Sequence, residues 1–168
     1  MEQFDAIIIG TGQAGPSLAD RLSEGGQKVA VIERGLLGGT CVNVGCVPTK
    51  ALVASARVAH VARRAAEFGV EIGSDLKVNM KRVKARKDEI SGASNKGLTR
   101  WMEGLENGTL IRGHARFESA NTVRVDDRLL TADKIFINTG GRAFVPPIPG
   151  IEDVDVMTNV EMMAVDFL

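Results

Sequence analysis

The start of the chain holds the pattern that constrains its fold most strongly. An apolar run over residues 4–9 leads directly into Gly10-Thr11-Gly12-Gln13-Ala14-Gly15, and residues 16–22 then have the character of a helix. In a strand, glycine loop and helix of this kind, the first glycine allows a tight turn. The second lets the backbone approach a pyrophosphate, and the third lets helix pack on strand. A single G-x-G-x-x-G is a weak indication, because glycine-rich turns are common.

A second buried strand is predicted over residues 28–32 and ends at Glu33. In a dinucleotide-binding unit, an acidic residue about twenty positions after the glycines hydrogen-bonds the ribose of adenosine. We therefore predict Glu33 as a ribose ligand, the alternative being an exposed carboxylate at a strand end. This pattern alone suits NAD as well as FAD.

The only two cysteines of the chain, Cys41 and Cys46, follow within the glycine-rich stretch 38–50. In a helix that begins near Thr40 they would lie about one and a half turns apart, near the limit for a disulfide. We expect a strained, partly accessible disulfide suited to redox chemistry, and a helix N-terminus that lowers the cysteine pKa. The alternatives are two free buried cysteines, or a structural metal, for which His60 and His114 form no recognisable ligand pattern with them.

The redox stretch carries a resemblance to a known family. Over Gly38-Gly39-Thr40-Cys41-Val42-Asn43-Val44-Gly45-Cys46-Val47-Pro48 and Lys50 the chain resembles, residue by residue, the flavoprotein pyridine nucleotide-disulfide oxidoreductases. Members include glutathione reductase, dihydrolipoamide dehydrogenase and mercuric reductase. The resemblance runs in register from residue 4 to about residue 150. It implies an α/β fold, a Rossmann-like FAD-binding domain with a parallel sheet and an inserted antiparallel meander, incomplete at the C-terminus. Residues 1–150 would form this domain, and residues 151–168 would begin a connection to an NAD(P)-binding domain.

The same resemblance implies roles for single residues. Cys41 would be the interchange thiol, Cys46 the thiol against the flavin, and Lys50 a catalytic neighbour of the flavin edge. The redox motif that follows Glu33 favours FAD as the nucleotide of this unit. The residues expected to contact FAD are Gly10, Gly12, Gly15, Glu33, Arg34, Gly39, Thr40, Lys50, His114, Ala115, Thr139 and Gly140. Asn138 departs from the small residue usual before the Thr-Gly pair.

The activity implied by the resemblance is electron transfer from NAD(P)H through FAD to the cysteine pair, and on to a small-molecule disulfide or a soft metal ion of the mercuric type. The complete enzyme would be a homodimer. The alternative is a truncated, non-catalytic FAD-binding module, because the sequence shows no second G-x-G-x-x-G and no C-terminal His-Pro segment. By itself the chain is expected to be inactive, and to associate through exposed apolar surface.

Composition excludes some partners. Lys plus Arg and Asp plus Glu balance at 21 each, so no net charge attracts nucleic acid or an acidic membrane. There is no long apolar run and no basic start with a cleavage site, which predicts no membrane segment and no secretory signal. With two closely spaced cysteines, these features predict the cytoplasm. The basic run 81–87 is interpreted as a solvated helix face.

The remaining elements follow from local patterns. Helices are predicted at 50–66, lying between the flavin and the core, and at 79–106, capped by Asn79. Short strands at 109–113, 115–118, 122–125 and 129–130 are interpreted as the antiparallel meander, and 133–138 as a buried strand. Residues 73–78 are predicted as a loop, and a last helix is predicted to start near Val160. His60 is expected to be structural or exposed, and Trp101 and Met102 to lie in the core or an interface.

Overall fold

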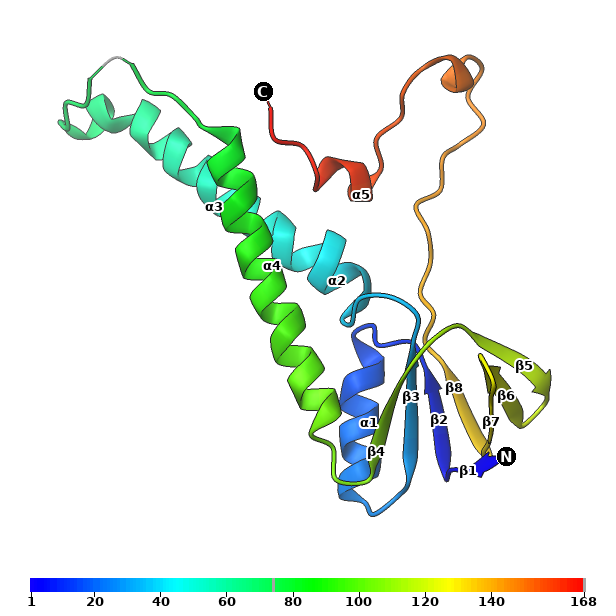
Figure 1. Cartoon of the computed structure of the whole chain (residues 1–168). Helices are drawn as coiled ribbons and strands as arrows, with labels where there is room; N and C mark the ends of the chain where they lie inside the picture. The colour runs from blue at the N-terminus through cyan, green and yellow to red at the C-terminus, as the bar shows by residue number, and fades with distance from the viewer. Residues whose placement is uncertain (74, 168) are drawn as a thin grey trace.

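A four-stranded parallel sheet lies at one end of the molecule, and helices extend away from it (Figure 1). The structure is a computed structural model that describes residues 1–73 and 75–167. The strand order is β4 (Gly108–Arg112), β3 (Val29–Glu33), β2 (Ala6–Ile9) and β8 (Lys134–Ile137), and each neighbouring pair is parallel. This parallel sheet, with α-helices between its strands in the chain, agrees with the predicted α/β fold.

Both faces of this sheet are buried, which explains the unbroken apolar runs in its strands. Side chains on one face, such as Ile8 and Val31, pack with Ala19 of helix α1 (Ala14–Glu24) and with Met102 of helix α4 (Met80–Glu103). Alternate residues such as Ile7, on the other face, pack with residues of a second sheet. The strand period of two thus divides the core into two layers.

The second sheet contains three of the four strands predicted for the meander and one further strand, β1. Its order is β1 (Glu2–Gln3), β7 (Arg128–Thr131), β6 (Thr122–Val125) and β5 (Ala115–Ser119). Strands β5, β6 and β7 are antiparallel, whereas β1 pairs parallel to β7. The prediction that residues 109–113 belong to the meander is wrong: β4 is instead the edge strand of the parallel sheet, beside β3. The turn at Gly113, where φ is +147°, redirects the chain before β5.

The helices after β3 form an arm that extends away from the sheets (Figure 1). Helix α2 (Gly39–Val44) and helix α3 (Cys46–Arg63) are separated at Gly45, so the predicted continuous helix is wrong. A Cβ at Gly45 would lie 2.8 Å from the Thr40 carbonyl oxygen, because the backbone folds tightly there. The expectation that the helix at 50–66 lies between flavin and core stays a prediction, because it depends on where the flavin binds. In α3 only Pro48 and Ala51 are buried, and the helix packs along α4.

Helix α4 begins as predicted. The Asn79 side chain accepts a hydrogen bond from the Arg82 backbone N–H at 3.1 Å, an N-cap. The helix ends at Glu103, before Gly104, three residues earlier than predicted. Met102 is buried, whereas Trp101 is half-exposed and donates from Nε1 to Asp20. The core position predicted for Met102 is therefore confirmed, whereas Trp101, at 42% exposure, does not lie in the core.

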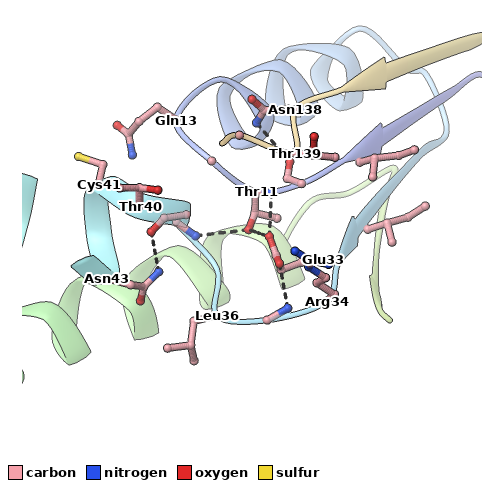
Figure 2. Close-up of a pocket in the computed structure, with 18 of the residues that line it drawn as sticks. Thr11, Gln13, Glu33, Arg34, Leu36, Thr40, Cys41, Asn43, Asn138 and Thr139 are labelled. Carbon is pink, nitrogen blue, oxygen red and sulfur yellow. Dashed lines mark hydrogen bonds between the residues drawn. The ribbon is translucent and has the colours of Figure 1, made fainter. Parts of the chain in front are cut away.

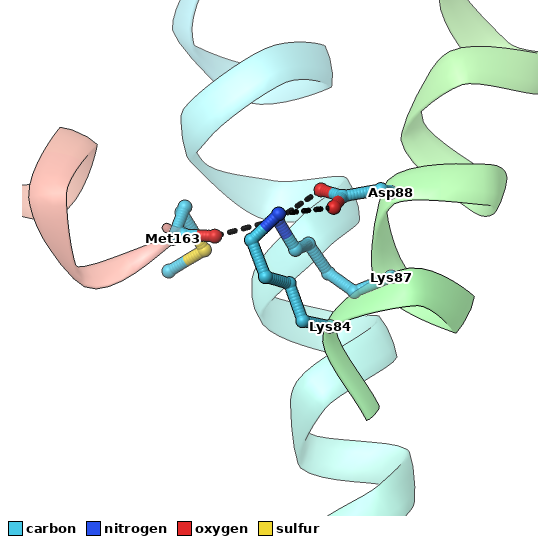
Figure 3. A network of polar contacts seen from close by, with 4 residues as sticks. All are labelled: Lys84, Lys87, Asp88 and Met163. Carbon is cyan, nitrogen blue, oxygen red and sulfur yellow. Dashed lines mark hydrogen bonds and ion pairs between the residues drawn. The ribbon is translucent and has the colours of Figure 1, made fainter. Parts of the chain in front are cut away.

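The basic run on α4 is not wholly a solvated face. Lys87 is 5% exposed and its ammonium contacts Asp88, which also pairs with Lys84 at 2.6 Å (Figure 3). Lys87 also donates to the Met163 carbonyl oxygen at 2.5 Å. This lysine therefore ties the C-terminal segment to α4.

That segment returns across the helices after a long extended connection. A 3-10 helix at Ile151–Asp153 is followed by helix α5 (Asn159–Met162), capped by Thr158, so the predicted helix start is confirmed. The Asn159 side chain donates to the Val44 carbonyl oxygen at 3.0 Å, which places α5 beside α2. Ser74 of the predicted loop and Leu168 lie outside the described residues. Within residues 1–73 and 75–167, no helix is both long and apolar enough to cross a membrane.

Candidate functional site: a pocket at the carboxyl edge of the sheet

A pocket with a volume of about 930 Å³ opens at the carboxyl ends of β2, β3 and β8. Open parallel sheets bind ligands at this edge, and the volume is within the range of small-molecule and cofactor sites. Twelve residues that the sequence predicted as catalytic or cofactor-binding line it: Gly10, Gly12, Glu33, Arg34, Gly39, Thr40, Cys41, Cys46, His114, Ala115, Thr139 and Gly140.

The glycine loop is built for close approach of backbone to backbone. Gly10 has φ +102°, and a Cβ there would lie 2.2 Å from the Asn138 carbonyl oxygen. A Cβ at Gly15, which is buried under the loop, would lie 2.3 Å from the Gly10 carbonyl oxygen. Gly12 is different, because the nearest atom to a Cβ there would be Nδ2 of Asn138, at an ordinary 3.5 Å. Gly10 and Gly15 are therefore required by the fold, whereas Gly12 faces the pocket.

Asn138 has a structural explanation that the sequence did not offer. Its side-chain amide donates to the Gly10 carbonyl oxygen at 3.3 Å, across the ends of β8 and β2 (Figure 2). The residue that departs from the family's small residue thus holds the glycine loop against β8. The close approach of the two segments is retained.

Glu33 is fixed by the glycine loop at the end of β3 (Figure 2). One carboxylate oxygen accepts hydrogen bonds from the Thr11 hydroxyl at 2.6 Å and the Thr11 backbone N–H at 3.0 Å. The other accepts from the Gly35 backbone N–H at 2.8 Å. Burial opposes ionisation of Glu33, but these hydrogen bonds outweigh it and lower the pKa below its ordinary value of 4.5. The site therefore holds a carboxylate at neutral pH.

The cysteines lie on either side of the break at Gly45. Cys41 is partly buried in α2, and Cys46 is exposed at the first position of α3. Both are free thiols. The side-chain hydrogen bond with Cys46 raises the pKa of Cys41, with further contributions from burial and from the charge that Cys46 can carry. The expectation that the helix N-terminus lowers the pKa is therefore wrong for Cys41, because the interaction with Cys46 and burial outweigh the backbone hydrogen bonds that lower this pKa.

The remaining predicted residues do not all lie in the pocket. Arg34 and His114 both line the pocket and contact one another, with 3.4 Å between Nη1 of the arginine and Nδ1 of the histidine. Lys50 is exposed on α3 and is not among the residues that line the pocket. Its catalytic role stays a prediction. His60 is exposed farther along α3, as expected.

Sequence reasoning missed several lining residues. These are chiefly Thr11, Gln13, Asn43, Asn138 and Arg142. Thr11 and Gln13 lie inside the glycine motif and Asn43 inside the redox motif, so the motifs themselves carried the signal. Arg142 follows the Thr-Gly turn and has no such motif. Among the described residues, no three His, Cys, Asp or Glu side chains gather where they could hold a metal ion.

The fold and the pocket together define a class of protein. A parallel sheet with a glycine loop, a carboxylate at the second strand end and a cysteine pair at the same edge is a nucleotide-binding domain that carries a dithiol. The sequence model of the pyridine nucleotide-disulphide oxidoreductase family matches residues 4–165. The chain belongs to this family.

Curated relatives and solved structures agree with this membership. A mercuric reductase from Bacillus cereus is 36% identical over 162 residues, which cover 95% of this chain and 25% of that protein. A dihydrolipoyl dehydrogenase from Acholeplasma laidlawii is 31% identical over 169 residues, covering 98% of this chain and 50% of that protein. The Cu(II) complex of the HOCl-induced flavoprotein disulfide reductase RclA from Escherichia coli superimposes with a TM-score of 0.78 at 32% identity, covering 99% of this chain and 35% of that one. The chain thus spans a quarter to a half of the length of these proteins.

Proposed function

We propose that this chain binds FAD in the pocket and presents Cys41 and Cys46 as the redox-active pair of a disulfide oxidoreductase. The observation that carries the proposal is that both cysteines line the same pocket as the glycine loop and Glu33. Family membership and the flavoprotein among the structural neighbours support FAD as the nucleotide.

The residues present fit FAD. The loop at Gly12 and the N-terminus of α1 suit the pyrophosphate, because backbone N–H groups and the positive end of the helix dipole favour anions. The first turn of α1 has no acidic residue to oppose this. Arg34 and Arg142 add positive charge to the lining. The Glu33 oxygen that accepts only from the Gly35 N–H keeps acceptor capacity for a ribose hydroxyl. When bound, FAD supplies two-electron exchange between a reduced nicotinamide and a disulfide.

The cysteine pair performs the exchange with substrate. A Cys41 thiolate attacks a substrate disulfide, which forms a mixed disulfide and releases the first substrate thiol. Cys46 then attacks the Cys41 sulfur, releases the second thiol and closes the Cys41–Cys46 disulfide. The hydrogen bond with Cys46 raises the pKa of Cys41, so formation of the attacking thiolate is favoured at higher pH. A soft metal ion is the other substrate class that two thiolates suit.

The finer features of the activity follow from the relatives. Proteins named mercuric reductase, dihydrolipoyl dehydrogenase and disulfide reductase support a mercuric ion or a small-molecule disulfide as the electron acceptor and NAD(P)H as the donor. We assign residues 1–150 to the FAD-binding domain and residues 151–168 to a connection toward an NAD(P)-binding domain. A homodimer in the cytoplasm is part of the same proposal.

Titration with FAD tests the binding proposal. The purified chain is mixed with increasing FAD, and flavin fluorescence and visible absorbance report binding. Gly12→Ala has room in the fold but narrows the pocket, so we expect FAD affinity to fall at least tenfold. Gly97→Ala, on α4 with open space around its Cβ, is the matched control and should bind as the wild type does. A wild-type chain that takes up no FAD, or a G12A variant that binds equally well, would refute the proposal.

A further inference from the structure

Two asparagine side chains from different helices meet at one buried backbone carbonyl, that of Leu37. Asn95 of α4 donates from Nδ2 to the Leu37 oxygen at 2.6 Å, and Asn43 of α2 donates to the same oxygen at 2.9 Å. Asn95 also donates to Oδ1 of Asn43 at 3.3 Å, and Asn43 donates to the Gly39 carbonyl oxygen at 2.9 Å. All four amide hydrogens of the pair therefore have acceptors, which fixes both side chains in one orientation.

The carbonyl they hold lies where the chain turns into α2. Leu37 is fully buried and precedes Gly38 and Gly39, whose φ angles are +95° and +56°. Two successive left-handed residues reverse the chain immediately before the helix that carries Cys41. Thr11 holds this turn from the side of the glycine loop, because its carbonyl oxygen accepts from the Gly38 N–H at 3.0 Å. The asparagine pair holds it from the side of α4.

Helix α4 also holds the segment that carries the other cysteine. Arg86 donates to the Ala51 carbonyl oxygen of α3 at 3.0 Å, about one and a half turns after Cys46. The two cysteines belong to different helices separated by Gly45, so the geometry of a single helix does not fix their spacing. Helix α4 contacts both helices and can fix it.

No interaction within α4 explains an asparagine at position 95. Asparagine is a poor residue for a helix interior, because its amide competes for backbone hydrogen bonds. Here the amide makes no hydrogen bond within α4 and reaches a carbonyl 58 positions away in the sequence. We propose that Asn95 is a positioning residue, which holds α2 on α4 and thereby fixes the spacing of Cys41 from Cys46. The inference rests on the proposed redox function of the pair.

The consequence concerns disulfide formation. When the pair is oxidised by glutathione disulfide, the Cys41 and Cys46 thiols lose two electrons and two protons and form one S–S bond. Two glutathione thiols receive those electrons and protons. A fixed spacing keeps the effective concentration of one thiol at the other high. Loss of the Asn95 contacts loosens α2 and favours the dithiol.

The test is the dithiol–disulfide equilibrium in glutathione buffers, read by alkylation of free thiols and mass spectrometry. It needs no FAD. Asn95→Ala removes the side-chain amide. Asn95→Asp keeps the side-chain volume but cannot donate to the Leu37 carbonyl oxygen. If circular dichroism shows that N95A is unfolded, the equilibrium of N95D decides the test. We expect both to shift the equilibrium toward the dithiol by about three- to tenfold, the size of a net loss of one hydrogen bond.

Ser94→Ala is the matched control, because it removes a hydrogen bond to Ile90 within α4 and leaves the Leu37 carbonyl untouched. It should match the wild type within about twofold, the change of a surface substitution. Equal equilibria in wild type, N95A and N95D overturn this inference alone, provided the wild type forms the disulfide. A wild-type chain that forms no Cys41–Cys46 disulfide at any ratio overturns the proposed function and this inference with it.

Discussion

Replacement of Thr11 by valine tests how the glycine loop and the strand end support one another. Thr11 is fully buried, and its hydroxyl donates to the Glu33 carboxylate at 2.6 Å and accepts from the Gly38 N–H at 3.3 Å. Valine has nearly the same shape, so no cavity forms. The main loss is the hydrogen bond to a charged acceptor, worth about 1.5–3 kcal/mol. The longer bond from the Gly38 N–H is lost as well, but that N–H keeps the Thr11 carbonyl oxygen as its acceptor at 3.0 Å. We expect the free energy of unfolding to fall by about 2 kcal/mol at pH 7.

The pH dependence of this loss has a definite sign. The folded-state pKa of Glu33 is lowered, so its carboxylate stabilises the fold above pH 4.5 and that stabilisation is lost as the pH falls through the folded value. In the variant the pKa rises, because burial is opposed by fewer hydrogen bonds. Below the wild-type value the carboxyl is protonated in both proteins. The difference in free energy of unfolding between wild type and T11V should then narrow to about 1 kcal/mol, the value of a neutral hydrogen bond.

Urea unfolding followed by circular dichroism at pH 7 and at acidic pH measures both quantities. Thr131→Val is the control, since that hydroxyl donates to the Asn121 carbonyl oxygen on the exposed meander. Its effect should stay within about 0.5 kcal/mol. If T11V destabilises no more than T131V at pH 7, or if its effect grows as the pH falls, the coupling between Thr11 and Glu33 is wrong.

Two further predictions concern the cysteines and the C-terminal segment. In Cys46→Ala the hydrogen bond and the charge that raise the pKa of Cys41 are gone, so the pH midpoint of Cys41 alkylation should move to lower pH; an unmoved midpoint contradicts this. In Lys87→Met the buried donor to the C-terminal segment is gone, and cleavage at Glu161 by a glutamate-specific protease should be about fivefold faster. The exposed Lys81→Met on the same helix should cleave like the wild type, and equal rates in both variants would contradict the role of Lys87.

Features set by neighbouring residues were predictable from the sequence. The first strand, the glycine loop and Glu33 follow from residue types at short spacing, and the structure gathers them as predicted. The caps at Asn79 and Thr158 are equally local, because an N-cap needs only a side-chain oxygen and the next turn of helix.

Features set by distant partners were not predictable. The sequence of β4 has the same short-strand pattern as the strands of the meander, and only its pairing with β3 in the structure separates it from them. The break at Gly45 depends on the Thr40 backbone folding against it. The role of Asn138 depends on a carbonyl 128 positions earlier in the chain, which no local pattern reveals.

The central claim is that FAD and the cysteine pair occupy one pocket, and the visible absorption spectrum of the FAD-loaded chain tests it most directly. The spectrum is recorded before and after reduction of the disulfide under argon, for the wild type and for Cys46→Ser. The account predicts a broad band at wavelengths longer than those of free flavin, which appears on reduction in the wild type and is absent in C46S, because a thiolate then lies against the flavin ring. A flavin spectrum that reduction changes identically in both proteins would contradict the shared site.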